Sequence, residues 1–344
     1  LISKKKKNSQ VKTSDKKKTI LIITKIDTIE GLLEKLKKKY HIHYFPDASI
    51  NELKLINENE KKKISAIFTN PNRSKIKLDL NVIKLFSNLE VICTASTGLV
   101  HIDINLCKKK NIQVISLRKD LDVLKNISST AELSFLLMML SIRDVISSSI
   151  DVQKGNWDCE KFVGRQIDHL RVGVIGFGRL GKMFASYAKA FKAKVYIYDP
   201  YIKDTSHYLD YDFTSTLNDL AKKVDIISLH VHVTEETKEM VNKTFLSNCA
   251  ENVKIINTSR GEIVNEIDLV EFLRRNKKSK YMTDVINNEI TDRENSPIIK
   301  GFKDQDLENQ IFVTSHIGGM THDARYLAYH HSANSLINYH FANE

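Results

Sequence analysis

Short apolar runs alternate with amphipathic, lysine-rich segments along most of the chain. The runs have the length of buried parallel strands, and the segments between them have the apolar spacing of surface helices. Strands that alternate with helices form parallel sheets covered on both faces, so we predict an α/β fold. The predicted strands are 20–24, 41–45, 66–69, 90–94, 113–116, 172–175, 194–198, 226–230, 254–257, 281–285 and 311–313.

The same pattern predicts helices at 30–39, 51–63, 81–86, 104–110, 129–148, 182–191, 268–274 and 321–341. Ser129 and Glu132 have the spacing of a capping box at the start of the long helix 129–148. We expect the last helix, 321–341, to pack back on the first part of the chain.

A glycine-rich loop follows the strand 172–175 and leads into a helix, with glycines at positions 176, 178 and 181. In this arrangement Gly176 permits a tight turn, Gly178 lets the backbone approach a pyrophosphate, and Gly181 lets helix and strand pack closely. Asp199 ends the next strand, where a carboxylate accepts hydrogen bonds from an adenosine ribose and disfavours the 2′-phosphate of NADP. A crossover without ligand would leave the three spaced glycines unexplained. The loop therefore predicts NAD binding.

The positive charge is concentrated at the start of the chain. Residues 1–18 hold eight Lys and one Asp, which accounts for +7 of the net charge of +11 and leaves +4 on the other 326 residues. We interpret residues 1–18 as a solvated, disordered tail, with an anchor for anionic surfaces as the alternative. A charge confined to a tail does not predict a nucleic-acid-binding protein.

Cysteine usage and hydropathy indicate where the protein works. Cysteines at 93, 107, 159 and 249 lack metal-ligand spacing and are typical of reduced thiols. No apolar run approaches the roughly 20 residues that cross a bilayer. We expect a cytoplasmic protein that does not contact a membrane.

Four residues with acid–base or anion-binding chemistry follow predicted strands of the second half of the chain: Arg260, Asp284, Glu289 and His316. Because the carboxyl ends of parallel strands lie on one edge of a sheet, these residues are expected to line one site. An arginine can hold a carboxylate by two parallel hydrogen bonds. A carboxylate beside a histidine stabilises the imidazolium, which can then donate a proton near neutral pH.

Together these motifs make the chain, over about residues 66–340, resemble the D-isomer-specific 2-hydroxyacid dehydrogenase family, most closely its phosphoglycerate dehydrogenase-like branch. The matching segments are Ser96-Thr97-Gly98, the helix start around Asn126 and Thr130-Ala131-Glu132, Gly155-Asn156-Trp157, the 176–181 loop, Tyr198-Asp199-Pro200, Ser228-Leu229-His230, Asn257-Thr258-Ser259-Arg260-Gly261, Asp284-Val285 with Glu289, and His316-Ile317-Gly318-Gly319. The resemblance implies a Rossmann NAD-binding domain inserted into a flavodoxin-like substrate domain. The implied parts are a tail 1–18, a substrate domain 19–126, an NAD-binding domain 127–316 and a returning helix 317–344.

The resemblance also implies roles for individual residues. Arg260 would bind the substrate carboxylate and polarise the 2-oxo group, and His316, paired with Glu289, would exchange the proton with that oxygen. Backbone amides around Ser96, Thr97 and Gly98 would hold the carboxylate from the other domain, in a cleft that closes over the substrate. Asp284 would bind the nicotinamide carboxamide and Asp199 the ribose. The full set implied for the cofactor is Gly176, Gly178, Arg179, Leu180, Gly181, Asp199, His230, Thr258, Ser259, Asp284 and Gly318.

The implied activity is hydride transfer between NAD and C2 of a D-2-hydroxy acid or 2-oxo acid, with D-3-phosphoglycerate as the first candidate substrate. Arg73 falls where the phosphoglycerate branch places a phosphate-binding arginine, although an ordinary surface charge is an equal alternative. Glyoxylate, hydroxypyruvate or a sugar-derived acid are other candidates, because Val100, His232 and Thr283 depart from the usual family pattern. An NADH-sensing corepressor-like binding module is the alternative from a different class.

Three further expectations concern metals, assembly and chain length. His230 and His232 lie two apart on a predicted strand, but no third ligand accompanies them, so no metal site is expected. Members of the family usually dimerise through the dinucleotide domain, which implies a homodimer that uses the helix 129–148. The sequence ends soon after the last predicted helix, so we do not expect the regulatory extension of some phosphoglycerate enzymes.

Overall fold

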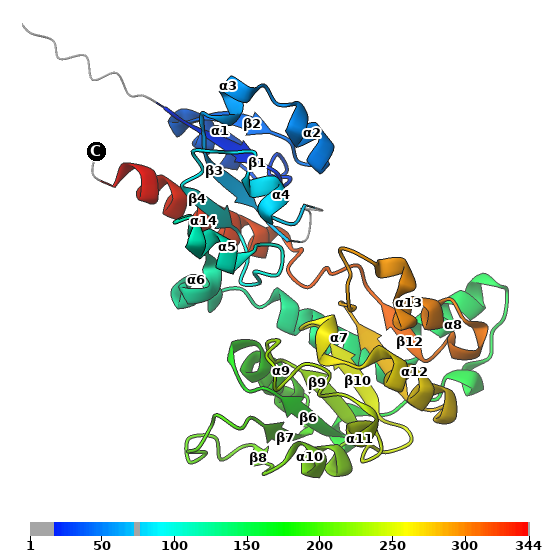
Figure 1. Ribbon diagram of the computed structural model, residues 1–344. Helices are drawn as coiled ribbons and strands as arrows, with labels where there is room; N and C mark the ends of the chain where they lie inside the picture. The colour runs from blue at the N-terminus through cyan, green and yellow to red at the C-terminus, as the bar shows by residue number, and fades with distance from the viewer. Residues whose placement is uncertain (1–16, 72–75, 343–344) are drawn as a thin grey trace, which may run out of the picture. The chain divides into compact units, whose positions relative to one another are not determined.

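The computed structural model describes residues 17–71 and 76–342, which divide into two compact units (Figure 1). The first unit ends at Val123 and resumes at Tyr326, and the second unit runs from Leu124 to Arg325. The chain returns to the first unit later than the expected 316/317 boundary. The backbone N–H groups of residues 317 and 318 donate to Asp284. This contact keeps these residues with the second unit.

The predicted tail 1–18 lies mostly outside the described residues, but its last residue belongs to the first sheet. Lys18 begins strand β1 and its Nζ lies 2.7 Å from Glu90 Oε2. The ordered fold therefore starts before the predicted end of the tail.

The first unit contains a five-stranded parallel sheet with the order β2-β1-β3-β4-β5. This is the flavodoxin-like order, which confirms the predicted fold of this unit. The strands are β1 Lys18–Ile22, β2 Tyr40–Tyr44, β3 Ile64–Thr69, β4 Val91–Thr94 and β5 Gln113–Ser116. The helices before the second unit are α1 Leu32–Lys39, α2 Ile50–Leu55, α3 Glu58–Lys61, α4 Leu80–Ile83, α5 Ile104–Lys109 and α6 Leu121–Leu124.

The second unit contains a seven-stranded parallel sheet with the order β12-β11-β10-β9-β6-β7-β8. Its strands are β6 Arg171–Ile175, β7 Lys194–Tyr198, β8 Asp212–Phe213, β9 Ile226–Leu229, β10 Lys254–Asn257, β11 Lys280–Thr283 and β12 Ile311–Val313. The chain first extends the sheet from β6 through β7 to β8 and then returns to the other side of β6. This reversal is the doubly wound order of a dinucleotide-binding fold, as predicted.

Helices cover both faces of the second sheet. The helices of this unit are α7 Ser129–Arg143, α8 Val145–Gln153, α9 Arg179–Ala190, α10 Leu217–Lys223, α11 Lys243–Leu246, α12 Glu266–Arg275 and α13 Pro297–Phe302, and all but α8 bury residues. On one face, Leu137 of α7 and Phe184 of α9 are buried in one apolar core. On the other face, Leu220 of α10, Phe245 of α11 and Leu269 of α12 are buried in a second core. Short 3-10 helices occur at Leu117–Lys119, Cys159–Phe162, Ile167–His169, Gly261–Ile263, Arg293–Asn295 and Gln305–Leu307.

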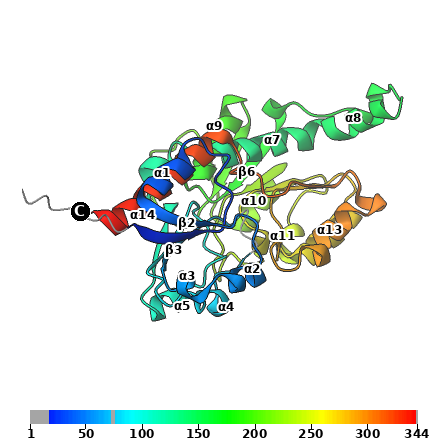
Figure 2. The ribbon, with the colours of Figure 1, turned by 90° about the horizontal axis from the view of Figure 1, so that it is seen from above.

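The long helix predicted at 129–148 is two helices. Asp144 has a left-handed backbone with φ 49°, which ends α7 and starts α8. The predicted capping box is also wrong, because the Oγ of Ser128, and not of Ser129, donates to Glu132 Oε1 at 2.5 Å. Figure 2 shows α8 continuing beyond the end of α7, and none of its residues is buried.

Among the described residues, one stretch is long and apolar enough to cross a membrane, Leu121–Arg143, with mean hydropathy 1.2. This stretch consists of α6, a short connection and α7. Leu137 and Met138 of α7 are fully buried in the core of the second unit. Packing on the sheet thus accounts for part of its apolar character, because about a third of the stretch is buried.

The last helix, α14 (His322–Phe341), packs on the first sheet, as predicted. The Sγ of Cys93 in β4 donates to the Ser332 carbonyl at 3.3 Å. The Oη of Tyr40 in β2 donates to the Leu336 carbonyl at 3.1 Å. Ala333 and Leu336 are fully buried, so the first unit needs this distant segment to complete its core.

Candidate active site

The three glycines of the 176–181 loop meet different physical requirements. Gly176 has φ 89°, and a Cβ there would lie 2.7 Å from the His230 carbonyl oxygen. A Cβ on Gly181 would lie 2.0 Å from the Gly176 carbonyl oxygen. No heavy atom lies within 4 Å of the Cβ position of Gly178. Two glycines are therefore needed for packing within the protein, and the third leaves open space at the position predicted for a pyrophosphate.

Asp199 joins the end of β7 to the glycine loop. Its Oδ2 accepts from the Phe177 N–H at 2.8 Å, and its Oδ1 accepts from the Tyr201 N–H at 3.0 Å. The carboxylate therefore lies beside the loop, as a ribose-binding acid should. It also helps to fix the loop conformation.

The side chain of Arg179 does not face the predicted cofactor site but binds backbone carbonyls of the protein. Its Nη1 donates to the carbonyls of Leu124, at 2.9 Å, and of Ile127. Burial lowers the pKa of this guanidinium. Arg179 and Leu180 begin helix α9, whose first N–H groups have no partner within the helix. What these two residues can offer to an anion is main-chain N–H groups.

The side chains of His230, Thr258 and Ser259 bond within the protein. His230 Nε2 lies 2.8 Å from Ser228 Oγ, and burial lowers its pKa to about 3, so the ring is neutral. Thr258 Oγ1 lies 2.6 Å from the Oγ of Ser134 in α7, and Ser259 Oγ donates to the Leu229 carbonyl at 2.5 Å. These contacts fix the ends of β9 and β10 beside the glycine loop. In the described part of the chain, no group of three or more His, Cys, Asp or Glu residues could hold a metal ion.

His316 and Glu289 form the acid–base pair that their sequence positions predicted. His316 Nδ1 lies 2.7 Å from Glu289 Oε1, and both side chains are half-buried, with 25% and 29% exposed. His316 has a left-handed backbone with φ 57°, a conformation that costs a non-glycine residue about 1–3 kcal/mol. The segment around it must therefore supply contacts that hold it.

Asp284 supplies those contacts. Its carboxylate is 1% exposed and accepts from Thr314 Oγ1 at 2.6 Å and from the Ile317 and Gly318 N–H groups, both at 2.7 Å. It thereby fixes the turn that carries His316. The family resemblance assigned Asp284 to the nicotinamide, whereas its visible role is to position this turn. Thr314, which the sequence reasoning missed, has a hydroxyl at the end of a strand as its only sequence signal.

Arg260 follows β10, and its position depends on the next residue. A Cβ on Gly261 would lie 1.9 Å from the Ile286 carbonyl carbon and 2.2 Å from the Asn287 nitrogen. Only glycine lets the Arg260 loop pack against the segment that leads to Glu289. Asn257 Nδ2 donates to the Arg260 carbonyl at 2.9 Å and fixes the other side of the loop. Arg260, Asp284, Glu289 and His316 thus lie on connected loops of one unit.

In the first unit, the Ser96–Gly98 loop follows β4, and the Ser96 hydroxyl stabilises its conformation. Ser96 Oγ donates to the Gly98 carbonyl at 2.8 Å and lies 2.9 Å from Thr94 Oγ1. The buried His101 has its Nε2 3.2 Å from the same Thr94 hydroxyl. These contacts fix the loop that the resemblance assigned to the substrate carboxylate. Arg73, the predicted phosphate ligand, lies outside the described residues.

The family model described as "D-isomer specific 2-hydroxyacid dehydrogenase, NAD binding domain" matches residues 135–318. The chain belongs to this family. The predicted family and the NAD cofactor are confirmed, and the matched residues contain both the glycine loop and the His316–Glu289 pair. The second unit is the NAD-binding domain.

Curated relatives include family members with different named substrates. The hydroxypyruvate reductase of Thermotoga maritima is 31% identical over 254 residues, which cover 74% of this chain and 78% of the reductase. The D-3-phosphoglycerate dehydrogenase of Methanocaldococcus jannaschii is 30% identical over 254 residues, which cover 74% of this chain and 46% of that enzyme. The chain therefore spans about half the length of the phosphoglycerate dehydrogenases it matches.

Solved structures share the whole fold. The D-lactate dehydrogenase of Aquifex aeolicus, in complex with NAD and lactic acid, is 27% identical with a TM-score of 0.76, covering 94% of this chain and 96% of that one. The pyruvate reductase of Chlamydomonas reinhardtii is 21% identical with a TM-score of 0.78, covering 95% and 97%. At its lower identity, the second match supports the fold alone.

Proposed function

We propose that the chain is an NAD-dependent oxidoreductase that interconverts a D-2-hydroxy acid and the corresponding 2-oxo acid. The observation that carries this proposal is the 2.7 Å contact between His316 Nδ1 and Glu289 Oε1, on loops fixed by Asp284 and Gly261. A hydride transfer to a carbonyl carbon leaves charge on the oxygen, so the reaction needs a proton donor. The pair supplies that donor.

We assign different roles to the two ring nitrogens of His316. Nδ1 faces the Glu289 carboxylate and donates to it, which leaves the exchange of the substrate proton to Nε2. In reduction, Nε2 gives its proton to the oxygen at C2, and in oxidation it takes the proton from the hydroxyl. Bound NAD(H) supplies the other half of the reaction, the hydride donor or acceptor. Glu289 stabilises the imidazolium in both directions.

The residues around the glycine loop fit NAD. Gly178 leaves open space, the start of α9 presents main-chain N–H groups, and Asp199 lies beside the loop at the end of β7. A carboxylate in this place accepts hydrogen bonds from a ribose and repels a 2′-phosphate. These residues support a preference for NAD over NADP.

Arg260 is the proposed carboxylate ligand, which gives a prediction that tests the substrate class. Arg260→Lys keeps the positive charge but loses the planar fork that binds a carboxylate by two hydrogen bonds. We expect KM for the 2-oxo acid to rise about 10- to 100-fold, as the loss of a charge-assisted hydrogen bond requires. The affinity for NADH should stay at its wild-type value, measured by NADH fluorescence. An unchanged KM would remove Arg260 from the substrate site.

The experiment that tests the proposed function is NADH oxidation with a panel of 2-oxo acids, comparing 3-phosphohydroxypyruvate, hydroxypyruvate, glyoxylate and pyruvate. D-3-phosphoglycerate remains our first candidate substrate, supported by the relatives that carry this name. The hydroxypyruvate reductase relative supports the second candidate. NADH binding with no turnover of any 2-oxo acid would instead favour a nucleotide-sensing module.

We also propose that the chain forms a homodimer through α7 and α8. Val145 and Val152 lie seven residues apart on one face of α8, and both are exposed, as is Leu136 on α7. A charge placed on such an apolar face opposes its burial. We expect Val152→Asp to convert the dimer to a monomer in light scattering, and the surface variant Lys154→Asp to leave it intact. A wild-type monomer would contradict the proposal.

A further inference from the structure

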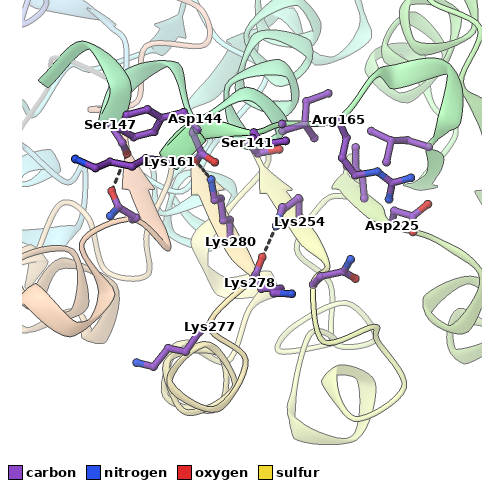
Figure 3. Close-up of a pocket in the computed structure, with 18 residues that line it drawn as sticks. Ser141, Asp144, Ser147, Lys161, Arg165, Asp225, Lys254, Lys277, Lys278 and Lys280 are labelled. Atoms are coloured by element: carbon purple, nitrogen blue, oxygen red, sulfur yellow. Dashed lines mark hydrogen bonds and ion pairs between the residues drawn. The ribbon is translucent and has the colours of Figure 1, made fainter. Parts of the chain in front are cut away.

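A pocket lies at the edge of the NAD-binding sheet opposite the glycine loop. It has a volume of about 510 Å³ (Figure 3). Its lining includes the first residues of three neighbouring strands, Ile226 of β9, Lys254 of β10 and Lys280 of β11. The glycine loop follows the carboxyl end of β6. A strand of four residues spans about 13 Å, so the pocket is separate from the dinucleotide site.

The pocket places two lysines side by side. Lys254 and Lys280 are paired in register as the first residues of neighbouring parallel strands. Side chains in register on neighbouring strands project from the same face, so both ammonium groups reach the same space. Lys280 pairs with Asp144, whereas the Nζ of Lys254 donates to the Lys278 carbonyl. One carboxylate thus serves two adjacent ammonium groups.

The other charged residues around the pocket are also mostly basic, and one of them, Lys161, is paired with Asp151 at 3.5 Å. Six of the lining residues are Lys or Arg and two are Asp: Asp144, Lys161, Arg165, Asp225, Lys254, Lys277, Lys278 and Lys280. Asp225 is already neutralised, because Arg171 donates to both of its carboxylate oxygens at 2.9 and 3.0 Å. Figure 3 shows Lys277 directed away from Lys254 and Lys280.

The pKa of Lys254 reflects this lack of compensation. Burial, and then the positive charge of Lys280, lower the pKa of Lys254 to about 8, while Asp144 acts in the opposite direction. A lysine with this environment gains stability when an anion joins it. The pairing of Lys254 with Lys280 on neighbouring strands and the lowered pKa of Lys254 therefore both indicate a site that favours an anion.

A fixed wall gives the pocket depth. The Arg165 N–H donates to the Ile142 carbonyl at 3.1 Å, and a Cβ on Gly164 would lie 2.4 Å from the same oxygen. The segment 162–165 is thus held against the end of α7. Phe162 and Val163 add apolar surface to this wall. A charged floor with an apolar wall suits a compound that has an anionic group and an organic part.

We propose that this pocket is a binding site for a small phosphorylated compound with at least two negative charges, held by Lys254 and Lys280 at the amino edge of the NAD-binding sheet. Lysine binds phosphate as a point charge, and a divalent or polyvalent group can neutralise two ammonium groups at once. The site lies outside the residues assigned to NAD and the 2-oxo acid. It gives the chain a place to bind a second anion while NAD is bound.

Calorimetric titration of the full chain with inorganic pyrophosphate and with ADP, at saturating NADH, tests the proposal. Lys254→Gln keeps a hydrogen-bond donor but removes the charge, and we expect binding about tenfold weaker. Asp144→Asn removes the carboxylate that occupies Lys280, and asparagine tolerates the left-handed backbone of Asp144. We expect this variant to bind about threefold to tenfold more tightly.

Lys194→Gln is the matched control. Lys194 is also the first residue of a strand on the same edge of the sheet, but its Nζ pairs with Asp212 and it does not line the pocket. The control should bind as the wild type does. Absence of binding by the wild type, equal weakening by the two lysine variants, or no tightening in Asp144→Asn would each overturn the proposal.

Discussion

Replacing His316 by glutamine is expected to lower kcat for 2-oxo acid reduction about 10³-fold, because it removes a positioned general acid. Glutamine has a similar reach but cannot deliver a proton near neutral pH. NADH binding should be unchanged, since the cofactor loop lies on other segments of the unit. Steady-state kinetics and an NADH fluorescence titration measure the two quantities separately. A kcat within a few-fold of the wild type would exclude His316 as the proton donor.

Two further variants separate the proton transfer from general effects of charge. His207 is an exposed histidine of the same unit, 3.9 Å from Asp204, so His207→Gln removes an imidazole beside an acid and should leave kcat unchanged. Glu289→Gln keeps the size of the side chain but removes the charge that stabilises the imidazolium. Because Glu289 acts through His316, we expect kcat to fall about 10- to 100-fold with KM unchanged, an effect of one to three kcal/mol.

Two glycine-to-alanine variants in the same loop are expected to affect different properties, one the stability of the fold and the other the binding of NADH. The Cβ of Gly181→Ala would lie 2.0 Å from a backbone oxygen that cannot move freely, so we expect the free energy of unfolding to fall by about 3 kcal/mol. Gly178→Ala meets no heavy atom within 4 Å and has φ −74°, so the fold should keep its stability. Its methyl group occupies the space needed by the pyrophosphate, and we expect NADH binding to weaken at least about 100-fold, or about 2.7 kcal/mol.

Thermal unfolding and NADH titration of both variants give the comparison. The expected pattern is a lower Tm for Gly181→Ala and a wild-type Tm with lost NADH binding for Gly178→Ala. Wild-type NADH affinity in Gly178→Ala would show that the open space above the loop is not the pyrophosphate site.

The sequence predicted the sheets well because buried parallel strands leave a strong local signal. The strands at 113–116, 194–198, 254–257 and 311–313 have the predicted bounds. Short or amphipathic elements were missed, namely β8, α6, α10, α11 and α13, because a few residues do not establish a periodicity. The break at Asp144 was also missed, since a left-handed aspartate inside an apolar helical pattern has no local signal.

In the candidate site, too, features with a sequence signal were predicted and features that depend on long-range contacts were not. The pairing of His316 with Glu289 followed from the family motifs, whereas the task of Asp284 did not. Its carboxylate accepts three hydrogen bonds from the 314–318 segment, and such long-range contacts cannot be read from residue type or spacing. Likewise, the Arg179 guanidinium binds carbonyls of residues 124 and 127, far from it in sequence.

The dependence of the first unit on α14 determines the order in which the protein can fold during synthesis. The NAD-binding unit is continuous from Leu124 to Arg325, so all of it is synthesised before most of α14. The first sheet is synthesised earlier, but Tyr40 and Cys93 can reach their partners in α14 only after Leu336 and Ser332 have been made. Vectorial synthesis therefore lets the inserted unit fold first, and the amino-terminal sheet completes its core last.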